Sequence, residues 1–321
     1  METTEYPVGT FAHLSGEWLS MKKQQVKITT YAKYDMVIKK HLIPAIGGAP
    51  VDTITEEDLN CVLNRLLNYN SQGEKRILSS SSMKSIVLVS KSIFNYGIKM
   101  GVLKINPCHY TVPDTGKKQI DILTRDEQQK LERFLLEENT PSTLGIYICL
   151  YSGLRIGEIC ALRWDDVDME RSLIHVNHTL QRINCDLPSE RKTRLIVGTP
   201  KSPSSCRMIP LTNQLYSMLS SFKQKNEGIE YVIATPRHPL IEPRTYQYRF
   251  ERYLNVSQIR KVNFHVLRHT FATRCIESGM DMKTLSEILG HNSVEITMNR
   301  YVHPTLEAKR LQLEHLAASL K

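Results

Sequence analysis

The sequence lacks the patterns that mark secreted, zinc-ribbon and membrane-spanning proteins. Its seven cysteines are odd in number and none forms a C-x-x-C pair, so we expect reduced, mostly buried thiols. No apolar run approaches the ~18–20 residues of a membrane span. The first residues, Met1-Glu-Thr-Thr-Glu5, hold neither the basic nor the apolar region of a secretion signal, so we expect a cytoplasmic protein. Internal repeats and low-complexity tracts are also missing.

The charge balance is basic. The chain holds 42 Lys+Arg against 33 Asp+Glu, a net charge of +9. Such a balance favours polyanionic partners, of which DNA is the commonest, although basic proteins without nucleic-acid partners are also common. Residues 1–118 carry 15 Lys+Arg and 10 Asp+Glu, so the excess is spread along the chain. If DNA is bound, both parts of the chain are expected to touch it.

A length of 321 residues favours two domains. Apolar residues at helical spacing between residues 11 and 105 predict a compact bundle of four or five helices. The second of these helices is expected to stop at Pro44 and Gly47-Gly48, and Thr55-Glu-Glu-Asp58 is expected to open the third as a capping box. Residues 106–120 hold two prolines, one glycine and no periodicity, which is typical of a linker. The segments expected are a helical domain over residues 1–108, a linker over 109–121, and a second domain over 122–321.

The second domain combines the hydrophobic periodicity of helices with that of strands. Thr124-Arg-Asp-Glu127 is a capping box that opens a helix, and residues 143–163 predict an apolar helix. The period then changes to two, which predicts strands near residues 173–176, 179–181, 194–197 and 207–210, and the remainder is helical. The sequence thus predicts a mainly α protein with a small antiparallel β-sheet.

One stretch combines the side chains needed to act on a phosphodiester. His265 and Arg268 are three residues apart and share a helix face near the helix start, where free N–H groups favour an anion. Arg155, flanked by Gly153 and Gly157, offers a second guanidinium that can neutralise phosphate oxygens. Zinc binding is the rival for His265 and His269, but Val266 stands where the zincin motif needs Glu, so we expect no metal.

Three further residues complete the candidate set. Glu158 is better placed to orient a guanidinium or imidazole than to touch a phosphate, which it would repel. Lys201 lies in a predicted hairpin turn, from which its flexible stem can reach a groove and protonate a departing oxyanion. His291 can move a proton near neutral pH.

Tyr301 is the candidate nucleophile, since a phenolic oxygen can attack phosphorus and hold it covalently. A straight helix would separate it from His291 by about 15 Å. Both should act on one phosphate, so we expect a break between Val294 and Tyr301, or delivery of the tyrosine in another way. The tail from Thr305 to Lys321 is amphipathic and either packs on its own domain or is donated to a neighbouring subunit.

Together these residues resemble the tyrosine recombinase (phage integrase) family, and the hairpin looks closest to integrases of conjugative transposons. The resemblance covers residues 120–321 strongly, and residues 9–108 look like the helical core-binding domain of the family. The motifs that support it are Ser152-Gly-Leu-Arg-Ile-Gly-Glu158, Thr199-Pro-Lys-Ser202, His265-Val-Leu-Arg-His-Thr-Phe-Ala-Thr273, Leu289-Gly-His291 and Tyr301.

The resemblance implies a role for each residue. Arg155 and Arg268 would stabilise the pentacoordinate transition state, with His291 bonded to a non-bridging oxygen. His265 would assist proton transfer at the nucleophile, and Lys201 would protonate the departing 5′ oxygen. Tyr301 would form a 3′-phosphotyrosyl link. Glu158 would support these groups from behind.

The resemblance also implies the protein's partners. The expected function is site-specific recombination of double-stranded DNA through a Holliday junction, by a homotetramer that exchanges its C-terminal helices. No metal or ATP would be needed, and an accessory excision factor could take part. Many such integrases carry a further N-terminal arm-binding domain, so we expect a simpler two-domain enzyme or a shortened chain. The alternatives are a non-catalytic DNA-binding protein that kept this fold, and a metallohydrolase.

Overall fold

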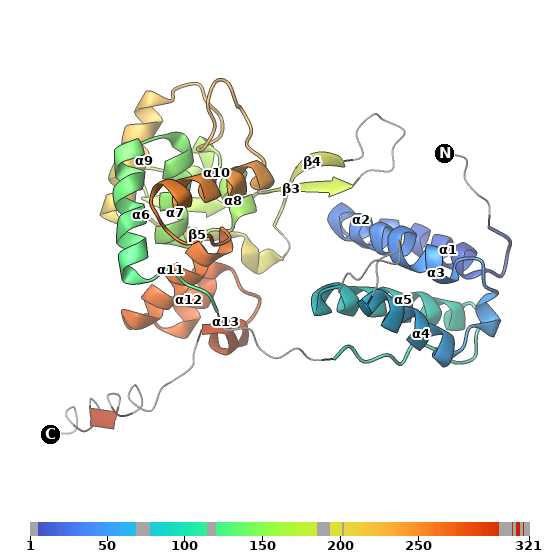
Figure 1. Ribbon diagram of the computed structural model, residues 1–321. Helices are drawn as coiled ribbons and strands as arrows, with labels where there is room; N and C mark the ends of the chain where they lie inside the picture. The colour runs from blue at the N-terminus through green and yellow to red at the C-terminus, as the bar shows by residue number, and fades with distance from the viewer. Residues whose placement is uncertain are drawn as a thin grey trace. The chain divides into compact units, whose positions relative to one another are not determined.

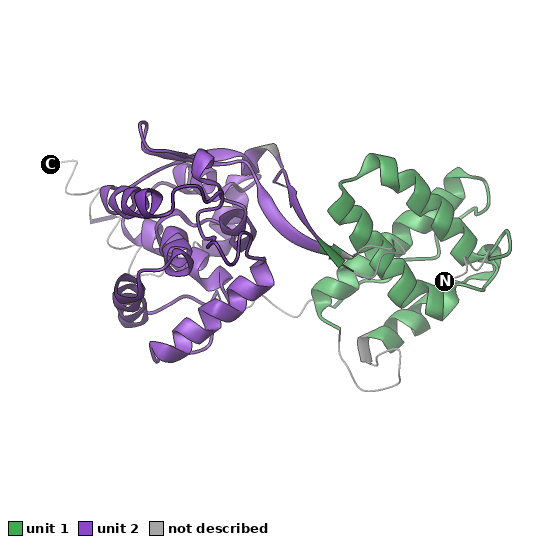
Figure 2. Cartoon of the chain, turned by 90° about the horizontal axis from the view of Figure 1, so that it is seen from above, with its two compact units in different colours: residues 1–118, 183–194 green, residues 119–182, 195–321 purple. Residues whose placement is uncertain are grey.

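The computed structural model describes residues 6–68, 78–113, 120–184, 193–200 and 202–301, together with residues 310, 313–314 and 317. The chain divides into two compact units, residues 1–118 with 183–194 and residues 119–182 with 195–321 (Figure 2). We call them the first unit and the second unit. Lys201 and most of the tail from Thr305 to Lys321 lie outside the described residues.

The first unit is helical, as the periodicity predicts. Its helices turn apolar side chains such as Phe11, Trp18 and Phe94 into one core. The predicted capping box is confirmed, because the Thr55 N–H donates to Asp58 Oδ2 at 3.0 Å and the Asp58 N–H donates to Thr55 Oγ1 at 3.2 Å. The elements are α1 (Phe11–Gln25), α2 (Ile28–Val37), the π-helix η1 (Ile38–Leu42), α3 (Ile43–Ile46), the 3₁₀ helix η2 (Val51–Thr53), α4 (Glu56–Asn68) and α5 (Ser80–Lys99) (Figure 1).

Pro44 does not stop the second helix, contrary to the prediction. The π-helical turn η1 precedes α3 and Pro44 lies in the first turn of α3, where a missing N–H is tolerated. The helix ends before Gly47, and this part of the prediction is confirmed. A Cβ at this position would come within 2.6 Å of the Ile43 carbonyl oxygen, so only glycine fits.

The second unit contains the sheet. Strands β1, β2 and β5 form an antiparallel sheet in that order, and β3 pairs with β4. The predicted strands are therefore confirmed, with β1 as an addition, and the fold is mainly α with a small antiparallel sheet. From residue 125 onward the elements are α6 (Arg125–Glu138), α7 (Pro141–Ser152), α8 (Ile156–Cys160), η3 (Trp164–Asp166), β1 (Val167–Asp168), β2 (Leu173–Val176), β3 (Thr179–Asn184), β4 (Thr193–Gly198), η4 (Pro203–Ser205), β5 (Arg207–Pro210), α9 (Asn213–Lys225), α10 (Pro243–Val256), α11 (His265–Glu277), α12 (Met282–Leu289) and α13 (Val294–Tyr301).

Helix α7 is the centre of the second unit. It is buried on nearly every side, and it contacts α6, α8, α9, α10 and α11. The prediction of one apolar helix over residues 143–163 is wrong, because α7 ends at Ser152 and α8 begins at Ile156. Gly153 makes the break with a φ of +65°, and a Cβ there would lie 2.6 Å from Phe271 Cδ1. The resulting turn presents Arg155 at the end of a rigid, buried helix.

Candidate active site

Arg155 is held in place by Glu158. The carboxylate accepts the Arg155 backbone N–H at 2.9 Å and its Nη1 at 2.7 Å. Glu158 is only 3% exposed. Burial opposes its ionisation, but Arg207 and Arg155 outweigh that effect and keep the pKa of Glu158 below its usual value. The ionised carboxylate fixes the direction of the guanidinium, because a charge-assisted hydrogen bond is short and strong.

Arg207 is a functional candidate that the sequence analysis missed. Its side chain is 6% exposed, and its Nη2 and Nη1 donate to the two carboxylate oxygens of Glu158 at 3.0 and 3.2 Å. Glu158 thus bridges two arginines. Arg207 is buried, and Arg155 faces a cavity. The sequence signal was weak, because Arg207 merely begins the strand β5.

Three consecutive carbonyls at the end of α12 each accept a hydrogen bond from a different arginine. The last carbonyls of a helix lack partners within the helix and carry partial negative charge, so they suit guanidinium groups. The three arginines therefore converge just before the turn that carries His291. The bonds are Arg207 Nε to Ile288 O (2.5 Å), Arg268 Nη2 to Leu289 O (2.7 Å) and Arg155 Nη2 to Gly290 O (3.1 Å).

Arg268 is buried, with 1% of its surface exposed. Its Nη1 donates to the Gly153 carbonyl at 2.7 Å, so it ties α11 to the turn before Arg155. Burial, followed by the charge of Arg155, lowers the pKa of Arg268 to about 9. The guanidinium therefore remains charged at neutral pH.

His291 contacts Arg268 directly, with 3.1 Å between Arg268 Nη2 and His291 Nε2. A guanidinium can only donate, so Nε2 is the acceptor. The proton of the neutral ring then lies on Nδ1, which donates to Thr297 Oγ1 at 2.8 Å. Burial and the nearby arginines, Arg268 and Arg155 foremost, lower the pKa of His291 to about 3. The ring is neutral, and its tautomer is set by its two partners.

Tyr301 is the last residue of α13. Its hydroxyl lies 2.7 Å from Nδ1 of His269. Of the two alternatives expected, a break between Val294 and Tyr301 is not formed, because α13 is continuous over this span. The chain turns earlier, at Gly290 with a φ of +64°, and α13 packs against α12. This turn brings the tyrosine back toward α11.

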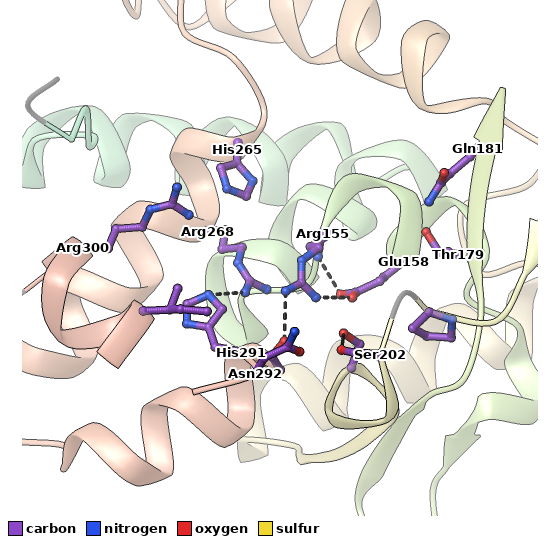
Figure 3. A pocket seen from close by; sticks show the side chains of 14 residues that line it. Arg155, Glu158, Thr179, Gln181, Ser202, His265, Arg268, His291, Asn292 and Arg300 are labelled. Atoms are coloured by element: carbon purple, nitrogen blue, oxygen red, sulfur yellow. Dashed lines mark hydrogen bonds and ion pairs between the residues drawn. The ribbon is translucent and has the colours of Figure 1, made fainter. Parts of the chain in front are cut away.

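A cavity of about 400 Å³ gathers most of the candidate residues (Figure 3). Arg155, Arg268 and Arg300 contribute positive charge, and Glu158, the one carboxylate among the described residues of the wall, is already paired. Such a cavity fits an anion of the size of a phosphodiester. The other lining residues are Thr179, Gln181, Pro200, Ser202, Ser205, His265, Gly290, His291, Asn292 and Ile296.

The structure therefore brings five predicted residues together in the second unit. Arg155, Glu158, Arg268, His265 and His291 line the cavity. Tyr301 lies beside them, since the charges of Arg268, Arg300 and Arg155 all oppose the rise that burial causes in its pKa. Lys201 lies outside the described residues, and its neighbours Pro200 and Ser202 line the cavity.

His269 and Arg300 are further residues of the site that the sequence analysis did not assign. His269 was weighed there only as half of a metal pair with His265. Among the described residues, no three His, Cys, Asp or Glu side chains gather in a way that could hold a metal ion. Within the same residues no helix is long and apolar enough to cross a membrane.

The pair of Glu158 and Arg207 gives a stability prediction. Replacing Glu158 by glutamine leaves Arg207 buried without a counter-charge, so we expect the free energy of unfolding of the second unit to fall by about 3 kcal/mol. The double variant Glu158→Gln, Arg207→Met should recover part of this loss. The measurement is urea unfolding followed by Trp164 fluorescence in a Trp18→Phe background, because Trp18 belongs to the first unit.

The matched control for that prediction is an exposed ion pair. Lys261→Met removes the 2.8 Å contact with Glu251, in which the lysine side chain is 73% exposed. We expect a change below about 1 kcal/mol. Equal losses for Lys261→Met and Glu158→Gln would contradict the structural importance of the buried pair.

Two family models match the chain. The model described as Phage integrase family matches residues 121–307, and the model described as Phage integrase, N-terminal SAM-like domain matches residues 10–67. A tyrosine recombinase XerC-like protein of Caldanaerobacter subterraneus subsp. tengcongensis is 27% identical over 330 residues, with 96% of this chain and 82% of the relative covered. The transposase from transposon Tn916 of Enterococcus faecalis is 26% identical over 247 residues, with 70% of this chain and 59% of that protein covered.

Solved structures show the same fold. The Tn1549 transposon integrase in complex with circular intermediate DNA has a TM-score of 0.77 at 22% identity, with 96% of this chain and 99% of that chain covered. A lambda integrase dimer bound to a COC′ core site has a TM-score of 0.65 at 21% identity, with 89% and 97% covered. Both likenesses extend over the first and the second unit.

Proposed function

Because the chain belongs to the phage integrase family, and is a tyrosine recombinase that cleaves and rejoins DNA, we propose that Tyr301 attacks a phosphodiester held in the cationic cavity. The product is a 3′-phosphotyrosyl link and a free 5′ hydroxyl. The observation that supports this best is the cavity lined by Arg155, Arg268 and Arg300 in the same unit as Tyr301, because the charges of all three arginines act on its hydroxyl. The covalent link retains the energy of the broken bond, so rejoining requires neither ATP nor a metal ion.

Arg155 and Arg268 hold the phosphate in this scheme. Arg155 and Arg268 each use part of their guanidinium on the carbonyls at the end of α12, which leaves other N–H groups for the non-bridging oxygens. Because the donors are fixed before DNA arrives, they stabilise the extra negative charge of the pentacoordinate state with little reorganisation. Glu158 and Arg207 do not contact the phosphate in this scheme. Glu158 fixes the position of Arg155, and Arg207 binds Glu158 and the end of α12.

The imidazoles change their state when the phosphate binds. The negative charge of the phosphate offsets the three arginines and raises the pKa of His291, which then takes a proton on Nε2 and donates to a non-bridging oxygen. His265 lies on the cavity wall and assists proton transfer at the nucleophile. Lys201, in the segment between β4 and β5, protonates the departing 5′ oxygen.

The rest of the chain serves recognition and assembly. Residues 1–108 form a core-binding domain, residues 109–121 a linker, and residues 122–321 a catalytic domain with a C-terminal exchange helix. The lambda integrase tetramer bound to a Holliday junction supports a tetramer here as well. In this proposal the subunits of the tetramer exchange their C-terminal helices. The reaction we infer is recombination at a specific DNA site, with an accessory excision factor as a further partner. The cysteines that the structure describes are free thiols, which fits a cytoplasmic location.

Covalent capture of DNA tests this proposal. The protein is incubated with a fragmented genomic library, the adducts that survive SDS are collected, and their ends are sequenced to define the site. A nicked half-site duplex of that sequence should then trap the enzyme, and peptide mapping should find the nucleotide on Tyr301. Tight, sequence-specific binding without any adduct would overturn the proposal in favour of a non-catalytic DNA-binding protein.

A further inference from the structure

The hydroxyl of Tyr301 is bonded to an imidazole that the proposed mechanism has not used. His269 Nδ1 lies 2.7 Å from the hydroxyl oxygen, and the ring centres are 5.6 Å apart. His265, to which the family resemblance assigns proton transfer, lies one helical turn away. Its ring meets the His269 ring edge-on, with the centres 4.5 Å apart.

The direction of this hydrogen bond depends on the tautomer of His269. The charges of Arg268, Arg300 and Arg155 oppose the rise that burial causes in the pKa of Tyr301. When the proton of the neutral His269 ring is on Nε2, Nδ1 accepts the hydroxyl proton of Tyr301. Nδ1 is unprotonated in this arrangement, as a proton acceptor must be.

The charges around His269 make it a weak base until DNA binds. Burial first, then Arg300 of α13 and Arg268 of α11, lower the pKa of His269 to about 4, while Asp121 before α6 acts in the opposite direction. A phosphodiester in the cavity faces the same two arginines. Its charge offsets theirs, and the second negative charge of the pentacoordinate state offsets them further, so the imidazole gains basicity as the attack proceeds.

We propose that His269 is the catalytic residue that accepts the phenolic proton of Tyr301 during DNA cleavage, an inference that rests on the proposed function. In this step the O–H bond of Tyr301 breaks and an Nδ1–H bond forms on His269. The phenolic oxygen forms its bond to phosphorus while the bond to the 5′ oxygen breaks, and Lys201 gives that oxygen its proton. On rejoining, the 5′ hydroxyl attacks phosphorus, Lys201 regains the proton and His269 returns its own to the phenolate.

The test measures single-turnover cleavage of the nicked half-site by two variants, His269→Ala and Lys201→Ala. Each variant is combined in turn with fluorotyrosine at position 301 and with a 5′-thiol leaving group. His269→Ala should slow formation of the adduct by about 10²–10³-fold. Fluorotyrosine at position 301, whose phenol is more acidic, should restore most of that rate. Lys201→Ala should respond in the opposite way, with restoration by a 5′-thiol leaving group and none by fluorotyrosine.

Three outcomes would overturn the inference. These are a normal rate for His269→Ala, a normal rate for His269→Gln, which keeps a hydrogen-bond acceptor but takes up no proton at neutral pH, and restoration of His269→Ala by the 5′-thiol instead of fluorotyrosine. Melting temperatures close to that of the unaltered protein show that the variants fold. If the unaltered protein itself forms no adduct, the proposed function fails and not the role of His269 alone.

Discussion

Replacing Tyr301 by phenylalanine is expected to abolish the DNA adduct while leaving DNA affinity unchanged. The phenyl ring has no oxygen to bond to phosphorus, so no rate of cleavage should remain above background. Tyr301 is not among the residues that line the cavity, and therefore its hydroxyl adds little to phosphate binding. The hydrogen bond to His269 is lost, which should lower stability by about 0.5–1.5 kcal/mol.

The measurement compares adduct yield on the nicked half-site with affinity by fluorescence anisotropy. Tyr248→Phe is the matched control, since Tyr248 lies on α10 with 56% of its surface exposed and outside the cavity. It should form the adduct at the normal rate. An adduct of undiminished yield in Tyr301→Phe would mean that another of the 14 tyrosines is the nucleophile.

Local patterns in the sequence predicted the local structure well. The capping box of Thr124 and Glu127 is formed in the structure, and the alternation in Leu173–Val176 gives a strand whose residues alternate in burial. The capping box depends only on residues three apart, and the alternation of the strand can be read along its own four residues, although its pairing with β1 and β5 is not local. The helical bundle of the first unit follows from periodicity for the same reason.

Breaks inside apolar helices could not be predicted in this way. Residues 144–150 are buried all along α7, so hydrophobic periodicity gives no sign of where it ends. The end at Gly153 depends on Phe271 and Leu289, which approach from α11 and α12 far along the chain. Pro44 likewise fails to stop the second helix because the π-turn η1 leads directly into α3, and composition does not reveal such a turn.

Contacts across the second unit explain what was missed in the site. Arg207 binds Glu158, which lies 49 residues away, and His269 meets Tyr301 across 32 residues. In both pairs the number of residues between the partners matches no recognisable sequence pattern. The residues that belong to short motifs were found, and their catalytic roles remain predictions until the adduct and its variants are measured.

Arg268→Met is expected to slow cleavage by about 10³-fold. A preorganised donor to a developing oxyanion contributes about 10²–10³-fold, and Arg268 also supplies a charge close to the Tyr301 hydroxyl. The methionine fills most of the buried volume, but the carbonyls of Gly153 and Leu289 lose their donors. We therefore expect a stability loss of about 1–3 kcal/mol, which is too small to unfold the protein in the assay.

A second arginine on the same helix separates the chemical effect from the structural one. Arg274 also donates to a backbone carbonyl, that of Leu123 at 2.9 Å, but lies outside the cavity. Arg274→Met should therefore reduce stability while single-turnover cleavage at saturating protein stays normal. Arg268→Lys keeps the charge but not the planar fork, and should recover less than a tenth of the lost rate. If Arg268→Met and Arg274→Met slowed cleavage equally, Arg268 would act through folding and would not bind the phosphate.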